Sequence, residues 1–199
     1  ILRTTNGGGN WTVQASGTAN HLYGVFFTDA TTGTVVGGRI LRTTNGGANW
    51  TPQTSDSTIG LNAVSFIDAN TGTAVGQVGT ILRTTDGGLT WTSQASGTTR
   101  DLNAVSFIDA NTGTAVGTYP GIILRTTDGG ANWVLQTSGT TQTLQGVSFT
   151  DANTGTVVGR SGTILRTTDG GTDWQSLSSG TTLGLRGVSL IDVNTGTAV

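Results

Sequence analysis

Apolar and polar residues alternate in short runs along this chain, and turn-forming residues separate the runs. Residues 61–67, for example, read Leu-Asn-Ala-Val-Ser-Phe-Ile, and a second short run follows at 73–76. Alternation with a period of two, in β-branched and aromatic residues, is typical of β-strands. The 3.6-residue apolar period of an amphipathic helix does not occur, and Gly or Thr interrupts every segment. The pattern predicts an all-β protein.

Turn chemistry divides residues 61–97 into a four-stranded unit. Asp-Ala-Asn-Thr-Gly at 68–72 and Asp-Gly-Gly at 86–88 are turn sequences, because Asp and Asn bond their own backbone and Gly accepts a positive φ. A loop is expected at 77–79. The four strands are expected at residues 61–67, 73–76, 80–85 and 91–95.

This unit recurs along the whole sequence. Residues 61–76 and 102–117 are identical. The sequence Ile-Leu-Arg-Thr-Thr begins at Ile1, Ile40, Ile81, Ile123 and Ile164. A repeated four-stranded unit of about 41 residues has the period of a β-propeller blade.

The phase of the repeat predicts how the ends meet. Residues 1–17 hold the third and fourth strands of a unit, and residues 185–199 hold the first and second. We therefore predict a five-bladed β-propeller of four-stranded antiparallel blades, closed by one blade that the two termini share, which would leave no open sheet edge. A ring closed in this way is expected to be a monomer.

We expect a single domain over residues 1–199. Its blades are expected at approximately 22–56, 61–97, 102–139, 144–180, and 185–199 with 1–17. The alternative architectures are an open β-solenoid and a fragment of a larger propeller that closes by oligomerisation.

Composition excludes several classes of protein. The 199 residues include no Cys, which rules out disulfide scaffolds and cysteine nucleophiles. The net charge is −2 without a basic cluster, which argues against a nucleic-acid partner. No apolar run approaches the roughly 18 residues of a membrane helix, so membrane insertion is not expected.

The predicted hairpin between the third and fourth strands carries a recurring motif, Thr-x-Asp-x-Gly-x-x-Trp, at residues 84–91, 126–133 and 167–174. Two further copies have Asn6 and Asn45 in place of the aspartate. The motif resembles the Asp-box, or bacterial neuraminidase repeat. The whole unit is similar to the propeller repeat of photosystem II assembly and stability factor-like proteins, and this resemblance implies an extracytoplasmic or secreted location.

The resemblance also implies that the Asp-box is a folding device. The carboxylate would accept backbone N–H bonds in the hairpin, and the tryptophan would pack beneath it. The residues to which this role is assigned are Asp86, Asp128, Asp169, Asn6, Asn45, Trp11, Trp50, Trp91, Trp133 and Trp174.

Candidate catalytic groups are few. A sialidase needs a Tyr nucleophile paired with Glu, but the sequence has no Glu and only Tyr23 and Tyr119. A Ser–His–Asp triad would have to use His21, the one histidine. The turn at 68–72 lacks the later ligands of a calcium loop. The aspartates outside the repeated turns are Asp56, Asp101 and Asp173, and nothing in the sequence pairs them. We expect no enzyme activity, no metal and no cofactor.

Variation between the copies is concentrated in two loop classes. In an antiparallel meander, the loops after the second and fourth strands lie on one face, opposite the Asp-boxes. Loops on a rigid scaffold are where recognition usually occurs, and neutral variation is the alternative interpretation. The candidate binding residues in these loops are His21, Arg39, Arg100, Asp101, Tyr119 and Arg160.

One arginine and one aspartate recur in every unit. The sequence suggests direct ion pairs between them, with a ring of free arginines that binds an acidic partner as the alternative. The recurring residues are Arg3, Arg42, Arg83, Arg125 and Arg166, and Asp29, Asp68, Asp109, Asp151 and Asp192.

The leading functional prediction is a non-catalytic propeller that acts as a scaffold or protein-interaction module. One alternative is a lectin with repeated sites between the blades, because repeated weak sites give avidity. The other is a recently amplified or engineered repeat protein with no selected ligand. The expected partner is accordingly a protein or a glycan.

Overall fold

The structure is a computed structural model that describes residues 1–55 and 57–199. Within these residues the protein forms four four-stranded sheets and two two-stranded sheets, in which strands that follow one another in sequence pair antiparallel. The first four-stranded sheet comprises β3 (Leu22–Phe27), β4 (Gly33–Gly37), β5 (Ile40–Thr43) and β6 (Thr51–Pro52). The second comprises β7 (Leu61–Phe66), β8 (Gly72–Gly76), β9 (Ile81–Thr84) and β10 (Thr92–Gln94), with the 3₁₀ turn η1 (Gln77–Gly79) between β8 and β9.

The next two sheets repeat this plan. One comprises β11 (Leu102–Phe107), β12 (Gly113–Gly117), β13 (Ile123–Thr126) and β14 (Val134–Gln136). The other comprises β15 (Leu144–Phe149), β16 (Gly155–Gly159), β17 (Ile164–Thr167) and β18 (Gln175–Leu177), with η2 (Arg160–Gly162) before β17. None of the helical turns in the described residues is long and apolar enough to span a membrane.

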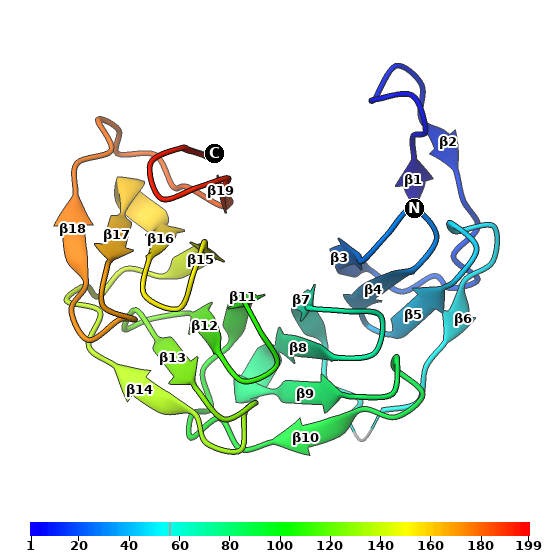
Figure 1. Cartoon of the computed structure of the whole chain (residues 1–199), viewed down its shortest axis with the longest axis horizontal. Helices are drawn as coiled ribbons and strands as arrows, with labels where there is room; N and C mark the ends of the chain where they lie inside the picture. The colour runs from blue at the N-terminus through cyan, green and yellow to red at the C-terminus, as the bar shows by residue number, and fades with distance from the viewer. Residues whose placement is uncertain (56) are drawn as a thin grey trace.

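The sheets stand side by side around an arc, with the first strand of each on the inside and the fourth on the outside (Figure 1). The core lies between neighbouring sheets: Val36 of β4 packs in one cluster with Val64, Leu82 and Trp91 of the next sheet. Because neighbours cover both of its faces, the second strand of each complete sheet is buried along its whole length.

A glycine at the start of the second strand makes room for an aromatic ring. A Cβ atom on Gly72 would lie 2.5 Å from the Phe66 ring. Since real Cβ atoms do not approach so closely, the ring could not lie against β8 if residue 72 had a side chain. The same holds for the glycine that begins the second strand of each four-stranded sheet, which faces a phenylalanine ring at 2.5–2.6 Å: Gly33, Gly72, Gly113 and Gly155.

The two ends of the arc hold the two-stranded sheets. They are β1 (Leu2–Arg3) with β2 (Thr12–Val13), and β19 (Val188–Leu190) with β20 (Gly196–Ala198). The termini lie on opposite sides of an open gap (Figure 1), and β1–β2 and β19–β20 are separate sheets. The all-β class and the four-stranded blades agree with the sequence, whereas the five-blade count and the shared blade are not confirmed and stay predictions.

Candidate functional site

A recurring arginine joins each sheet to the next. Arg83 on β9 donates from Nη1 to the Thr73 hydroxyl (2.9 Å) and from Nη2 to the carbonyl oxygen of Ala110 (2.5 Å) in the β11–β12 turn. Its guanidinium lies over the Phe107 ring, with Cζ 5.1 Å from the ring centroid. These contacts combine charge-assisted hydrogen bonds with a cation–π interaction. In the other units, the equivalent arginine donates to the equivalent backbone carbonyl of the next sheet; these residues are Arg3, Arg42, Arg125 and Arg166.

The hypothesis of direct Arg–Asp pairs is wrong for this geometry, because each partner is bonded elsewhere. Asp68 accepts the backbone N–H groups of Asn70 and Thr71 at 2.7 Å in its own turn. These bonds lower the pKa of Asp68, with the charge of Arg83 as a minor cause. The arginine crosses to the next sheet and is buried there, and this burial lowers its pKa. The alternative of freely exposed arginines therefore does not describe this residue either.

A glutamine on the outer strand forms a second link between sheets. Gln94 Nε2 donates to the carbonyl oxygen of Gly129 (2.9 Å), and its Oε1 accepts from Trp133 Nε1 (3.2 Å). Gln14 and Gln136 bond the next sheet in the same way. We call this pair of bonds the glutamine link. Sequence reasoning missed it, although Gln recurs three residues after Trp in four units, at positions 14, 53, 94 and 136.

The glutamine link is not formed between β3–β6 and β7–β10. Gln53 Nε2 donates to the carbonyl oxygen of Thr51 in its own strand. Among the described residues, Nε1 of Trp91 has no hydrogen-bond partner, although this tryptophan is only 1% exposed. This junction therefore differs from the three junctions at which Gln14, Gln94 and Gln136 form the link, although its sequence also has a glutamine at that position.

The Asp-box residues bond within their own hairpins. Asp86 Oδ1 accepts from the Thr84 hydroxyl (2.8 Å) and from the backbone N–H of Thr90 (3.0 Å). Its Oδ2 accepts from the Thr90 hydroxyl (2.5 Å). These bonds, those from Thr90 first, lower the pKa of Asp86 to about 2. In the box with an amide, Asn45 Oδ1 accepts from the Thr43 hydroxyl and from the N–H of Asn49, both at 3.0 Å.

The tryptophans of the four-stranded sheets pack against a phenylalanine of the same sheet. Trp91 meets the Phe66 ring edge-on, with centroids 5.8 Å apart and an interplanar angle of 88°. Trp50, Trp133 and Trp174 make equivalent contacts. Trp11 departs from the expected core position, because it is 59% exposed. The physical reason is that its sheet, β1–β2, has two strands and no inner strand that covers the ring.

The six candidate binding residues lie on neighbouring loops but in different sheets. The two loop classes adjoin, since Gly38 N–H donates to the His21 carbonyl and Val78 N–H to Asp101 Oδ1 (2.9 Å). Asp101 is half-buried, and the other five candidates are exposed. Arg39 borders a cavity of about 380 Å³. Asp56, which adjoins this cavity in sequence, lies outside the described residues.

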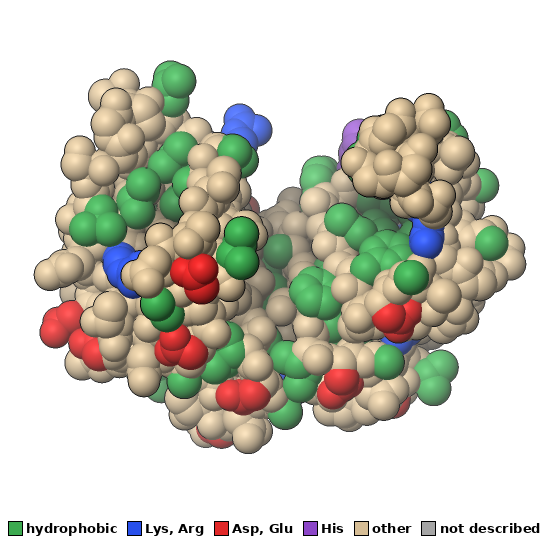
Figure 2. All heavy atoms as spheres, turned by 45° about the horizontal axis from the view of Figure 1, so that its top comes forward, with side chains coloured by type: hydrophobic (Ala, Val, Ile, Leu, Met, Phe, Trp, Pro, Cys, Tyr) green, Lys and Arg blue, Asp and Glu red, His purple; other side chains and the backbone are tan. Residues whose placement is uncertain are grey.

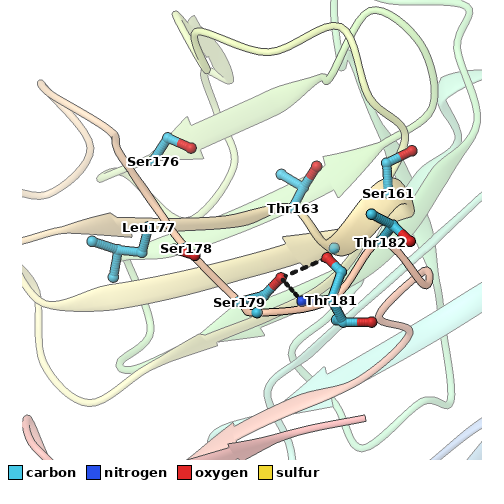
Figure 3. Close-up of a pocket in the computed structure, with 10 residues that line it drawn as sticks. Ser161, Thr163, Ser176, Leu177, Ser178, Ser179, Thr181 and Thr182 are labelled. Carbon is cyan, nitrogen blue, oxygen red and sulfur yellow. Dashed lines mark hydrogen bonds between the residues drawn. The ribbon is translucent and has the colours of Figure 1, made fainter.

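A second cavity on the loop face is lined by hydroxyl groups. It measures about 680 Å³ and lies between the β16–β17 turn and the segment that begins with β18 (Figure 3). The Ser179 hydroxyl donates to the carbonyl oxygen of Thr181 and accepts its N–H, as Figure 3 shows. Since the lining includes neither a carboxylate nor an imidazole, it offers hydrogen bonds but no acid–base pair.

The Asp-box face has two equivalent cavities between blades, of about 580 Å³ and 570 Å³. Arg42, Gln53 and Asp86 line the first, and the equivalent Arg125, Gln136 and Asp169 line the second. Acidic side chains are spaced along the lower rim of the arc (Figure 2). In the part of the protein that the structure describes, no three His, Cys, Asp or Glu side chains form a group that could hold a metal ion.

Comparison with known proteins identifies the repeat. Residues 56–139 match the family model described as photosynthesis system II assembly factor YCF48. The matched residues are similar to the repeat of photosystem II assembly factors, and they make up less than half of the 199 residues. None of the curated proteins matches it in sequence.

Solved structures share the propeller fold. One described as YCF48 bound to a D1 peptide is 24% identical, with a TM-score of 0.68, and the alignment covers 86% of this propeller and 57% of that protein. An ancestral GH74 enzyme is 18% identical with a TM-score of 0.67, and the alignment covers 84% of this chain and 25% of that one. The GH74 xyloglucanase from Xanthomonas campestris is 19% identical with a TM-score of 0.60, and the alignment covers 94% of this chain and 30% of that one. At this identity the likeness shows the fold, which hosts both assembly factors and enzymes.

Proposed function

We propose that this propeller is a non-catalytic protein-interaction module that binds through its variable loop face. The observation that carries the proposal is a set of three exposed arginines on these loops, Arg39, Arg100 and Arg160. Their guanidinium groups make no hydrogen bonds with the described residues, whereas the recurring arginines are bonded between sheets. On the same face, the carboxylate of Asp101 accepts the N–H of Val78. The family relationship and the peptide-bound neighbour also support a protein partner.

The chemistry of the loop face selects the kind of protein. Guanidinium groups bind carboxylates through paired N–H donors, and they remain charged at every physiological pH. A partner that presents acidic side chains fits this face, and its attraction should weaken as salt rises.

The carboxylates of the box face support a non-catalytic role. A glycosidase needs one carboxyl group that holds its proton near neutral pH. Hydrogen bonds lower the pKa of Asp128 to about 2, and they also lower the pKa of Asp169. Neither aspartate can act as the general acid in the cavity that they share. We extend the proposal to the Asp-box itself, whose bonds to its own hairpin support a structural role.

A lectin is the second candidate, because the two equivalent cavities between blades offer the repeated sites that it needs. The tryptophan rings of the four-stranded sheets pack against phenylalanines. A sugar would therefore be held by polar groups such as Gln136 and Asn153 in one cavity.

Binding to arrays of acidic, neutral and basic peptides of equal length, with a glycan array in parallel, tests the proposal. We expect acidic peptides to bind, binding to fall with added salt, and the triple variant Arg39→Ala, Arg100→Ala, Arg160→Ala to lose it. Asp173→Asn, an exposed position on the box face, is the control that should retain binding. Binding of glycans alone would favour the lectin, and no binding on either array would favour a repeat protein without a selected ligand.

A further inference from the structure

Two of the five boxes hold an amide at the position of the aspartate, and in both the next residue is glycine: Asn6 with Gly7, and Asn45 with Gly46. Deamidation, the loss of the asparagine side-chain amide, occurs most readily in the sequence Asn-Gly. Glycine has no side chain to hinder its backbone nitrogen, so the nitrogen can reach the amide carbon of the preceding residue.

The neighbouring residue in these boxes is suited to a carboxylate. In the third box of the four-stranded sheets, Asn132 Nδ2 donates to Asp128 Oδ2 at 2.7 Å. The equivalent residues in the two amide boxes are Asn10 and Asn49, which are also asparagines and are exposed. An amide at position 6 or 45 offers one oxygen, and two donors already occupy it. The second oxygen that Asn10 and Asn49 could bond is missing.

We propose that Asn6 and Asn45 are deamidation sites whose aspartate product completes the Asp-box. The inference rests on the structural role proposed for the box. The conversion would give residues 6 and 45 the second oxygen, and Asn10 and Asn49 would bond it as Asn132 bonds Asp128.

The reaction needs only water. The backbone nitrogen of the glycine attacks the asparagine Cγ, a new bond forms between them, and the bond from Cγ to the amide nitrogen Nδ2 breaks. The departing nitrogen takes the proton from the glycine and leaves as ammonia. Water then opens the cyclic imide. Attack at Cγ gives aspartate, and attack at the backbone carbonyl carbon gives isoaspartate, with no change in oxidation state.

Hydrogen bonding of the attacking nitrogen decides which of the two asparagines converts faster. The N–H of Gly46 donates to the carbonyl oxygen of Thr31 at 2.8 Å, and this bond must break before the nitrogen can attack. The N–H of Gly7 makes no hydrogen bond with the described residues. Both asparagine amides accept the same two bonds from their hairpins. Asn6 should therefore convert faster than Asn45 in the folded protein.

Peptide mapping by mass spectrometry, after incubation of the intact protein at mildly alkaline pH, tests the reaction. We expect conversion at Asn6 before Asn45 in the folded protein, and similar rates at both once it is denatured. Equal rates at the two sites in the folded protein would overturn the assigned order. Absence of conversion in the denatured protein would overturn the proposal as a whole.

Substitution tests the consequence of the product. Asn45→Asp should raise the melting temperature, and the gain should disappear when Asn49→Ala removes the donor to the new oxygen. A gain that persists with Asn49→Ala, or no gain at all, would refute the completed box. Asp86→Ala measures the role of the box separately: if it leaves the melting temperature unchanged, the structural role fails, whereas a loss there without a gain at Asn45→Asp refutes the further inference alone.

Discussion

The glutamine link should contribute to the free energy of unfolding only at the junctions where it forms. Gln94→Ala measures this contribution at one of them. The substitution removes the bond to the Gly129 carbonyl and the bond from Trp133 Nε1. Each hydrogen bond contributes about 0.5–1.5 kcal/mol net, so the free energy of unfolding should fall by about 1–3 kcal/mol. Because the two groups are only part-buried, water can partly replace the lost partner, which favours the lower half of that range.

Gln53→Ala is the matched control, since Gln53 occupies the same position but bonds only the Thr51 carbonyl of its own strand. We expect the free energy of unfolding to fall by no more than about 0.5 kcal/mol, because the substitution removes only one hydrogen bond, which is made within the same segment of chain. Urea unfolding followed by tryptophan fluorescence, with circular dichroism as the second probe, gives both values on one scale. Equal losses for the two variants would refute the reasoning, because the link would then contribute nothing beyond the ordinary effect of shortening a side chain.

Three further predictions concern the boxes and the arginines. Asp86→Ala should lower the melting temperature more than Asp86→Asn, with no dependence on added calcium, because the amide keeps the Oδ1 acceptor; equal losses would contradict this. Arg83→Lys should lower the free energy of unfolding by about 1–3 kcal/mol, because an ammonium cannot make both bonds. The charge swap Arg83→Asp with Asp68→Arg should not restore the stability that Arg83→Asp alone loses, and recovery would indicate a direct ion pair. The pKa of Asp86 falls from 3.8 to about 2 on folding, so its contribution is present above about pH 4 and is lost as pH falls towards 2. Acid melting curves should show a weaker decline for Asp86→Asn, and an unchanged decline would count against that contribution.

The strands could be predicted from the sequence to within about a residue. The unit at 61–97 was expected to hold strands at 61–67, 73–76, 80–85 and 91–95, and the structure has β7–β10 at Leu61–Phe66, Gly72–Gly76, Ile81–Thr84 and Thr92–Gln94. Two local signals explain this agreement. Period-two apolar residues mark the strands, and turn sequences such as Asp-Gly-Gly mark where they end.

Contacts between blades could not be predicted in the same way. The sequence shows that Arg83 and Asp68 recur at strand ends, but not that the arginine crosses to the Ala110 carbonyl of the next sheet. Backbone carbonyls are present at every residue, so the sequence carries no signal for which one accepts. The exposure of Trp11 likewise depends on whether an inner strand covers its sheet, and that is a property of the arrangement of the sheets.

The repeat is less uniform in its junctions than in its strands. Between later blades, Asn62 donates to the Leu102 carbonyl (2.9 Å) and the Ser65 hydroxyl accepts the N–H of Phe107 (3.2 Å). The first four-stranded sheet has Tyr23 and Phe26 at the corresponding positions. Phe26 has no hydrogen-bonding group in its side chain, and the exposed Tyr23 side chain makes no hydrogen bond with the described residues.

With Gln53 also turned to its own strand, the junction between β3–β6 and β7–β10 depends on apolar packing and on one arginine. Phe26 packs against Phe66 with centroids 6.2 Å apart, and Arg42 reaches the Ala69 carbonyl and lies over the Phe66 ring. Apolar packing lacks the directional bonds that fix one orientation of neighbouring sheets. Among the junctions between four-stranded sheets, local opening should therefore begin at this one, where the polar links of the later blades are missing.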